Sequence, residues 1–129
     1  MVQVKVLSEA ERQAGLRHAT DALDLARRLP VGESIVQAIL DLVRAARPGD
    51  GEPSIANNLA WGPGPRAGQA LMLTVRARAL LQGRLAPSLD DVAALAEPVL
   101  KHRIALTFAA RAEGETVSGL IQRLVARIG

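Results

Sequence analysis

The sequence contains no cysteine, and this absence excludes disulfide bonds, thiolate catalysis and cysteine-based zinc sites. Aromatic residues are almost as rare: Trp61 and Phe108 are the only two, so any core must be aliphatic. Long hydrophobic runs are also missing. No stretch approaches the roughly 18 apolar residues that a membrane helix needs, and the N-terminus lacks an apolar signal core. We therefore expect a soluble, cytoplasmic protein without a membrane partner.

The usual sequence signatures of catalysis are missing as well. The phosphate-binding loop G-x-x-x-x-G-K-[ST] requires a Gly-Lys pair, and the chain has none, so these residues cannot hydrolyse ATP unaided. The nucleophile elbow G-x-S-x-G is absent. His18 and His102 each lack a second histidine at helical spacing, so we predict no metal site. Asp90 and Asp91 fall in the first turn of a predicted helix, where capping and the helix dipole explain them without acid-base chemistry.

Length and composition indicate one helical domain. The chain has 129 residues, 49% of them hydrophobic, which is enough for a single sizeable core. Good helix formers recur throughout and predict an all-α fold. The formal net charge is +3, carried mainly by arginine. An arginine excess can indicate phosphate or nucleic-acid binding, but acidic residues are interleaved with the basic ones, which favours an ordinary mixed surface.

Caps and apolar periodicity divide the chain into a bundle of about five helices. Alternating valines at positions 2, 4 and 6 predict a short extended N-terminal segment, and Ser8 and Glu11 form a capping box for the first helix. The segment 48–53 is rich in helix breakers and predicts a surface loop. Pro98 predicts a kink or a pair of short helices. The helices are expected at about 8–29, 33–47, 65–82, 89–96 with 98–103, and 117–128.

The stretch from Trp61 to Gly83 is the most informative part of the chain. A Gly-Pro-Gly-Pro turn opens a long apolar helix, in which Pro65 suits the first helical position and Gly64 the cap. We expect Trp61 to anchor this turn by packing. A helix that is apolar nearly all round is usually the central one of a bundle. Its core face, at 100° per residue, is predicted to hold Ala70, Leu73, Thr74, Ala77, Leu80 and Leu81.

Arg66 is unusual on this helix. It lies on the predicted core face, in the first turn, where the helix dipole disfavours a cation by up to about 1 kcal/mol. Either an anionic group such as a carboxylate or phosphate compensates this charge, or the side chain extends to solvent or pairs with a local acidic residue. The residues alone leave these alternatives open.

Several motifs together resemble the C-terminal helical lid of MoxR-type AAA+ ATPases. They are Ala60–Ala67, Leu80–Leu81, Pro87–Val92, Leu95–Ala96, Pro98–Arg103 and Glu113–Thr116. The resemblance covers nearly the whole chain, and its specific part runs from Gly62 to Arg103. In that family the arginine at the start of the main lid helix is the sensor-2 residue, which reaches the γ-phosphate of ATP. The resemblance therefore implies that Arg66 is this residue, acting in catalysis, and that Gly64 and Pro65 lie with it at the nucleotide.

The resemblance also implies a larger parent protein. ATP with Mg²⁺ would be held mainly by a AAA+ core domain that residues 1–129 do not contain, so the isolated chain is one lid domain and not an enzyme. Neighbouring subunits of a ring and von Willebrand factor A domain proteins are the other implied partners, in a chaperone-like assembly role. The alternative is a free-standing basic helical adaptor that binds nucleic acid or a protein, although few aromatics and no basic stripe disfavour nucleic acid.

Overall fold

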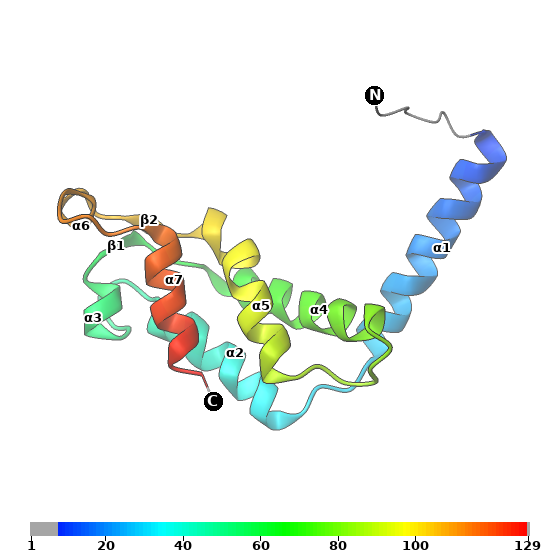
Figure 1. The fold of residues 1–129 in the computed structure, drawn as a ribbon, viewed down its shortest axis with the longest axis horizontal. Coiled ribbons are helices and arrows are strands. Elements are labelled where there is room, and N and C mark those ends of the chain that lie inside the picture. The colour runs from blue at the N-terminus through cyan, green and yellow to red at the C-terminus, as the bar shows by residue number, and fades with distance from the viewer. Residues whose placement is uncertain (1–7, 129) are drawn as a thin grey trace.

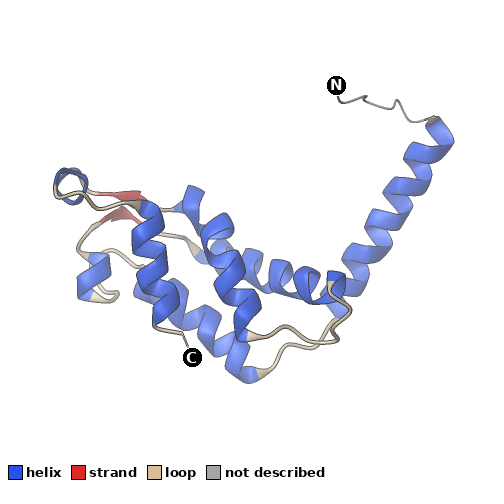
Figure 2. Cartoon of the chain, in the orientation of Figure 1, coloured by secondary structure: helices blue, strands red, loops and turns tan. Residues whose placement is uncertain are grey.

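The computed structural model describes residues 8–128 and confirms the all-α class (Figure 1). Helices dominate the chain and a small pair of strands lies at one end (Figure 2). The extended segment expected at 2–6 lies outside the described residues. None of the helices within 8–128 has the length and apolar character needed to cross a membrane. The longer helices are α1 (Glu9–Arg28), α2 (Glu33–Ala45), α4 (Pro65–Leu81), α5 (Leu89–Leu100) and α7 (Val117–Ala126).

Helix α1 begins at the predicted capping box and meets the rest of the molecule only near its C-terminal end. The Glu11 N–H donates to Ser8 Oγ at 3.2 Å, and the Ser8 N–H donates to Glu11 Oε2 at 3.0 Å. The helix continues unbroken to Arg28, and among its residues only Ala26 is buried. Its N-terminal part projects away from the other helices (Figure 1).

Helix α4 occupies the predicted central position, because it contacts α1, α2 and α5. Its buried residues, however, are Ala67, Leu71, Val75 and Ala79, spaced four residues apart. The predicted core face was therefore wrong. The residues assigned to it, Ala70, Leu73, Thr74, Ala77, Leu80 and Leu81, are half-buried or exposed, and Leu81 is 87% exposed. Since α4 is apolar on nearly all sides, its periodicity could not identify the side that the other helices cover.

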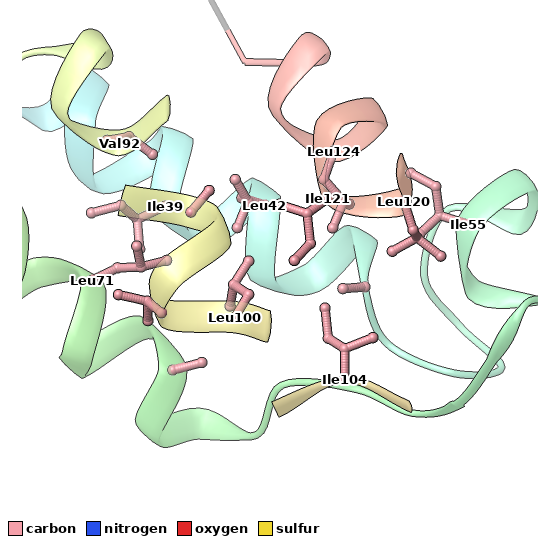
Figure 3. Close-up of a cluster of buried hydrophobic side chains, with 14 of the residues drawn as sticks. Ile39, Leu42, Ile55, Leu71, Val92, Leu100, Ile104, Leu120, Ile121 and Leu124 are labelled. Atoms are coloured by element: carbon pink, nitrogen blue, oxygen red, sulfur yellow. The ribbon is translucent and has the colours of Figure 1, made fainter. Parts of the chain in front are cut away.

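The core is aliphatic, as the scarcity of aromatic residues predicts. Branched side chains of α2, α4, α5 and α7 meet in one cluster, which α3 (Pro53–Ala56) and the segment after α5 complete (Figure 3). Its largest fully buried members include Ile39, Ile55, Leu71, Val92, Leu100, Leu120, Ile121 and Leu124. This cluster fixes α4 against α2 and α5, and thereby positions the start of α4.

Some local elements differ from the sequence-based expectations. Strands β1 (Leu59–Trp61) and β2 (Ala105–Leu106) form a two-stranded antiparallel sheet that the sequence did not predict. Helix α5 continues past Pro98 without dividing, and the 3₁₀ helix η1 (Lys101–Arg103) follows it. Pro98 is exposed, so water can reach the carbonyl group that loses its helical hydrogen bond. The short helix α6 (Phe108–Ala112) was not among the predicted helices.

Candidate functional site

The turn that precedes α4 is held at both ends. At its N-terminal end β1 pairs with β2, with Leu59 opposite Leu106 and Trp61 opposite Ala105. At its C-terminal end Pro65 occupies the first turn of α4 and Gly64 is the N-cap, as predicted. The Ala67 N–H donates to the Gly64 carbonyl oxygen at 3.1 Å. The backbone leading into Arg66 is therefore restrained by sheet pairing, by proline and by the helix itself.

Gly62 brings this turn close to the end of α2. A Cβ at position 62 would overlap the carbonyl oxygen of Ala46 and lie 3.0 Å from Pro48 Cδ. Only glycine permits this approach of two backbones. The neighbouring Pro63 is buried, and a small cavity of about 160 Å³ lies between the turn and the end of α2. Gly62 thus joins the start of α4 to α2.

The Arg66 side chain itself is exposed. Within residues 8–128 no acidic side chain pairs with it, so the local ion pair considered from the sequence is not formed. The N-cap of α4 provides no side-chain hydrogen bond either. A guanidinium and an uncapped helix N-terminus therefore lie together at the surface, and both favour a negatively charged partner.

The expected packing role of Trp61 was also wrong. The indole was expected to anchor the turn by packing, but Trp61 is 63% exposed. Phe108, the other aromatic residue, is also exposed. The turn is held instead by β-sheet pairing and by Gly62, which periodicity does not reveal.

A second group of arginines lies at the other end of α4, and no pattern in the sequence indicated that they would meet. Asp91 of α5 is fully buried and accepts hydrogen bonds from both Arg78 and Arg84. The Arg78 Nη1 to Asp91 Oδ1 distance is 2.6 Å, and the Arg84 Nη1 to Asp91 Oδ2 distance is 2.8 Å. The predicted capping role is confirmed, because Asp91 Oδ2 also accepts from the Ser88 N–H at 2.7 Å. This Asp91 cluster (Arg78, Arg84, Ser88 and Asp91) links α4 to α5.

The Asp91 cluster holds its carboxylate in the ionised form. The hydrogen bond from Arg84 lowers the pKa of Asp91 far below the usual value, and the Ser88 N–H and Arg78 lower it further, against the effect of burial. The same hydrogen bond raises the pKa of Arg84. A carboxylate so strongly stabilised as an anion is a poor general base, and its role here is structural.

The other candidate residues are scattered. His18 lies on α1 and His102 on η1, and both are exposed. Arg103 Nη1 donates to the Val99 carbonyl oxygen at 2.7 Å, which fastens η1 to the end of α5. No group of three or more metal-ligating side chains gathers anywhere between residues 8 and 128.

Comparison with known proteins agrees with this geometry. A family described as the AAA lid domain matches residues 53–124, which is more than half of the chain and includes the turn, α4 and the Asp91 cluster. The fold is also similar to a crystal structure described as a "putative ATPase" from Cytophaga hutchinsonii, with a TM-score of 0.73 and 19% identity. That similarity covers 99% of this chain and 45% of the other, so this chain spans less than half of that protein. No curated protein matches the sequence.

Proposed function

This chain belongs to the AAA lid domain family, and from that premise we propose that it is the C-terminal lid of a MoxR-type AAA+ ATPase. The nucleotide-binding core of that ATPase would lie outside these 129 residues. The resemblance of the segment from Gly62 to Arg103 to MoxR-type lids supports the finer assignment. The similarity of the fold to the Cytophaga protein, which is described as a "putative ATPase", supports only the coarser assignment to the lid of an ATPase.

The exposed Arg66, which pairs with no acidic side chain of residues 8–128, is the observation that carries this proposal. In the complete ATPase Arg66 would be the sensor-2 residue and donate hydrogen bonds to the γ-phosphate of ATP. The donor chemistry fits a phosphate group, since a guanidinium binds phosphate oxygens in a fork and the N-terminus of α4 adds a partial positive charge. Gly64 and Pro65 would lie beside the same phosphate. Because the chain has no phosphate-binding loop, ATP with Mg²⁺ would be held mainly by the core.

The position of α4 explains how such a contact would be transmitted. Arg66 stands at the start of a helix that contacts α1, α2 and α5, and Gly62 joins that start to α2. A hydrogen bond to a charged group contributes about 1.5–3 kcal/mol, which is enough to bias a hinge between two positions. Loss of the γ-phosphate would remove this contact and release the lid as one packed unit. The angle of the lid would thereby follow the nucleotide.

The proposed parent protein has the partners that the family resemblance implies. It would form a ring with neighbouring subunits in the cytoplasm, and it would act with von Willebrand factor A domain proteins in a chaperone-like assembly role.

Substitution of Arg66 in the complete ATPase tests the proposal. We expect Arg66→Ala to lower the rate of ATP hydrolysis about 100-fold or more, because arginines that contact the transferred phosphate contribute at least that much. Arg66→Lys should recover only part of the rate, since lysine keeps the charge but loses the fork. Arg111→Ala is the matched control, because Arg111 is an exposed arginine on α6, away from α4.

Steady-state turnover under saturating ATP separates the outcomes. A rate for Arg66→Ala equal to that of Arg111→Ala would contradict the sensor-2 assignment. The lid fold of each variant is checked by its thermal unfolding, so that loss of structure is not taken for loss of sensing.

A further inference from the structure

Helix α1 carries an apolar stripe that no part of residues 8–128 covers. Leu16, Ala19, Leu23 and Ala26 follow at helical spacing on one face. Leu16 is 68% exposed and Leu23 is 39% exposed. In folded proteins, most of the stability of a helix comes from the packing of its apolar face and not from helix propensity. We call Leu16, Ala19 and Leu23 the α1 stripe.

The α1 stripe continues an interface that already exists. Its last neighbour along the face, Ala26, is buried at the end of α1 that contacts α4. At that end Arg76 Nη1 donates to the Arg27 carbonyl oxygen at 3.1 Å. The N-terminal part of the helix projects beyond α4 (Figure 1). The same face is thus packed at its C-terminal end and open along the rest.

The opposite side of α1 is suited to solvent. Its residues are mostly polar or charged, namely Gln13, Arg17, Asp21, Asp24 and Arg28. Leu25 is the one leucine near that side, and it is 51% exposed. Helix α1 is therefore amphipathic, with an apolar face and a polar face. The partner must present an apolar surface to the α1 stripe alone.

We propose that the α1 stripe docks against the nucleotide-binding core of the same ATPase polypeptide. This inference rests on the proposed function, which supplies the core. The matched Cytophaga structure includes the counterpart of nearly this whole chain, and more than half of that protein lies outside the match. A second body of sufficient size therefore exists in a protein of this fold. Docking would extend the α1–α4 interface across the boundary between lid and core, so that α1 links the core to the far end of the helix that carries Arg66.

Amide hydrogen exchange compares α1 in the complete ATPase with α1 in the 129-residue chain. We expect the amides of residues 12–24 to exchange about tenfold more slowly in the complete protein, because docking suppresses local opening of the helix. Leu16→Gln should abolish most of that protection. Leu25→Gln is the matched control on the same helix and should retain it, since leucine and glutamine have similar helix propensities.

Each outcome bears on the docking separately from the sensing by Arg66. Equal exchange in the two proteins, or equal effects of the two glutamine variants, would overturn the docking even if Arg66→Ala lowers ATP turnover. Protection that Leu16→Gln removes would support the docking even if Arg66→Ala leaves turnover unchanged. Protection of α1 in the 129-residue chain that rises with protein concentration would assign the stripe to a second copy of the chain and overturn the proposal.

Discussion

The two ends of α4 use arginine in opposite ways. At the C-terminal end, Arg78 and Arg84 are both bound by the buried Asp91, and each is only about one-third exposed. At the N-terminal end, Arg66 is exposed and has no acidic partner within residues 8–128. At one end of α4, arginine side chains therefore join two helices. At the other end, the arginine side chain is exposed and accessible to an external anion.

The helix dipole makes this difference more informative. A cation near the C-terminus of a helix is stabilised, whereas one in the first turn is destabilised. Arg78 lies in the last turn of α4, so its position adds to the stability of the fold. Arg66 occupies the unfavourable end without compensation from the described chain. The sensor-2 proposal assigns this uncompensated charge to a ligand and not to folding.

The largest loss of stability is expected at the paired end. Asp91→Ala would leave Arg78 and Arg84 without their shared acceptor and remove the cap of α5. We expect the free energy of unfolding to fall by about 3 kcal/mol, the lower end of the range for a broken buried ion pair, because both arginines are partly solvated. Urea denaturation of the 129-residue chain measures this loss. Asp90→Ala, in the same turn but exposed, should cost less than about 1 kcal/mol. Equal losses for the two variants would show that the Asp91 cluster adds no stability.

The next effect is a dependence on pH. The pKa of Asp91 is lowered in the folded state, so below about pH 4 the unfolded chain binds more protons at this residue than the folded chain does. The stability that Asp91 contributes is present above that pH and is lost as the pH falls toward the folded pKa. Relative to Asp91→Asn, the native chain should therefore keep its advantage above about pH 4 and lose it progressively as the pH falls below that value, as urea denaturation at each pH would show. A difference that stays constant over this range would contradict the assigned pKa shift.

A smaller effect is expected at the turn that positions Arg66. Gly62→Ala should destabilise the chain by about 1–3 kcal/mol, because the new Cβ overlaps the backbone at Ala46. Gly68→Ala, six residues later inside α4, meets no atom within 4 Å and should stabilise the chain by about 0.5–1 kcal/mol. Thermal unfolding of both variants tests the opposite signs. Stabilisation by both would mean that the turn is not tightly packed on α2.

The smallest change in stability is expected for Arg66 itself. Arg66→Ala should alter the free energy of unfolding by less than about 0.5 kcal/mol, and toward higher stability, because it removes a cation from the first turn of α4. Urea denaturation beside Asp91→Ala completes the comparison between the two ends of the helix. A loss as large as that of Asp91→Ala would show that Arg66 supports the fold and would end the contrast.

Local signals predicted the elements whose causes are local. The capping box at Ser8, the capping role of Asp91 and the start of α4 at Pro65 all depend on residues a few positions apart, and all three are present. The β1–β2 pair depends on segments more than forty residues apart, and short apolar runs of this kind give no clear strand signal. The exposure of Trp61 could not be predicted from the sequence either, because it depends on which remote segments cover strand β1.

Composition and the chemistry of adjacent residues were enough to predict the helical class, the aliphatic core, the helix starts and the unusual position of Arg66 at one of them. The packed fold was needed to show which side of α4 is buried, that Asp91 binds two arginines, and that Arg66 has no acidic partner in the described chain. Pairing and burial depend on distances between segments remote in the chain, and these distances are set when the helices pack together.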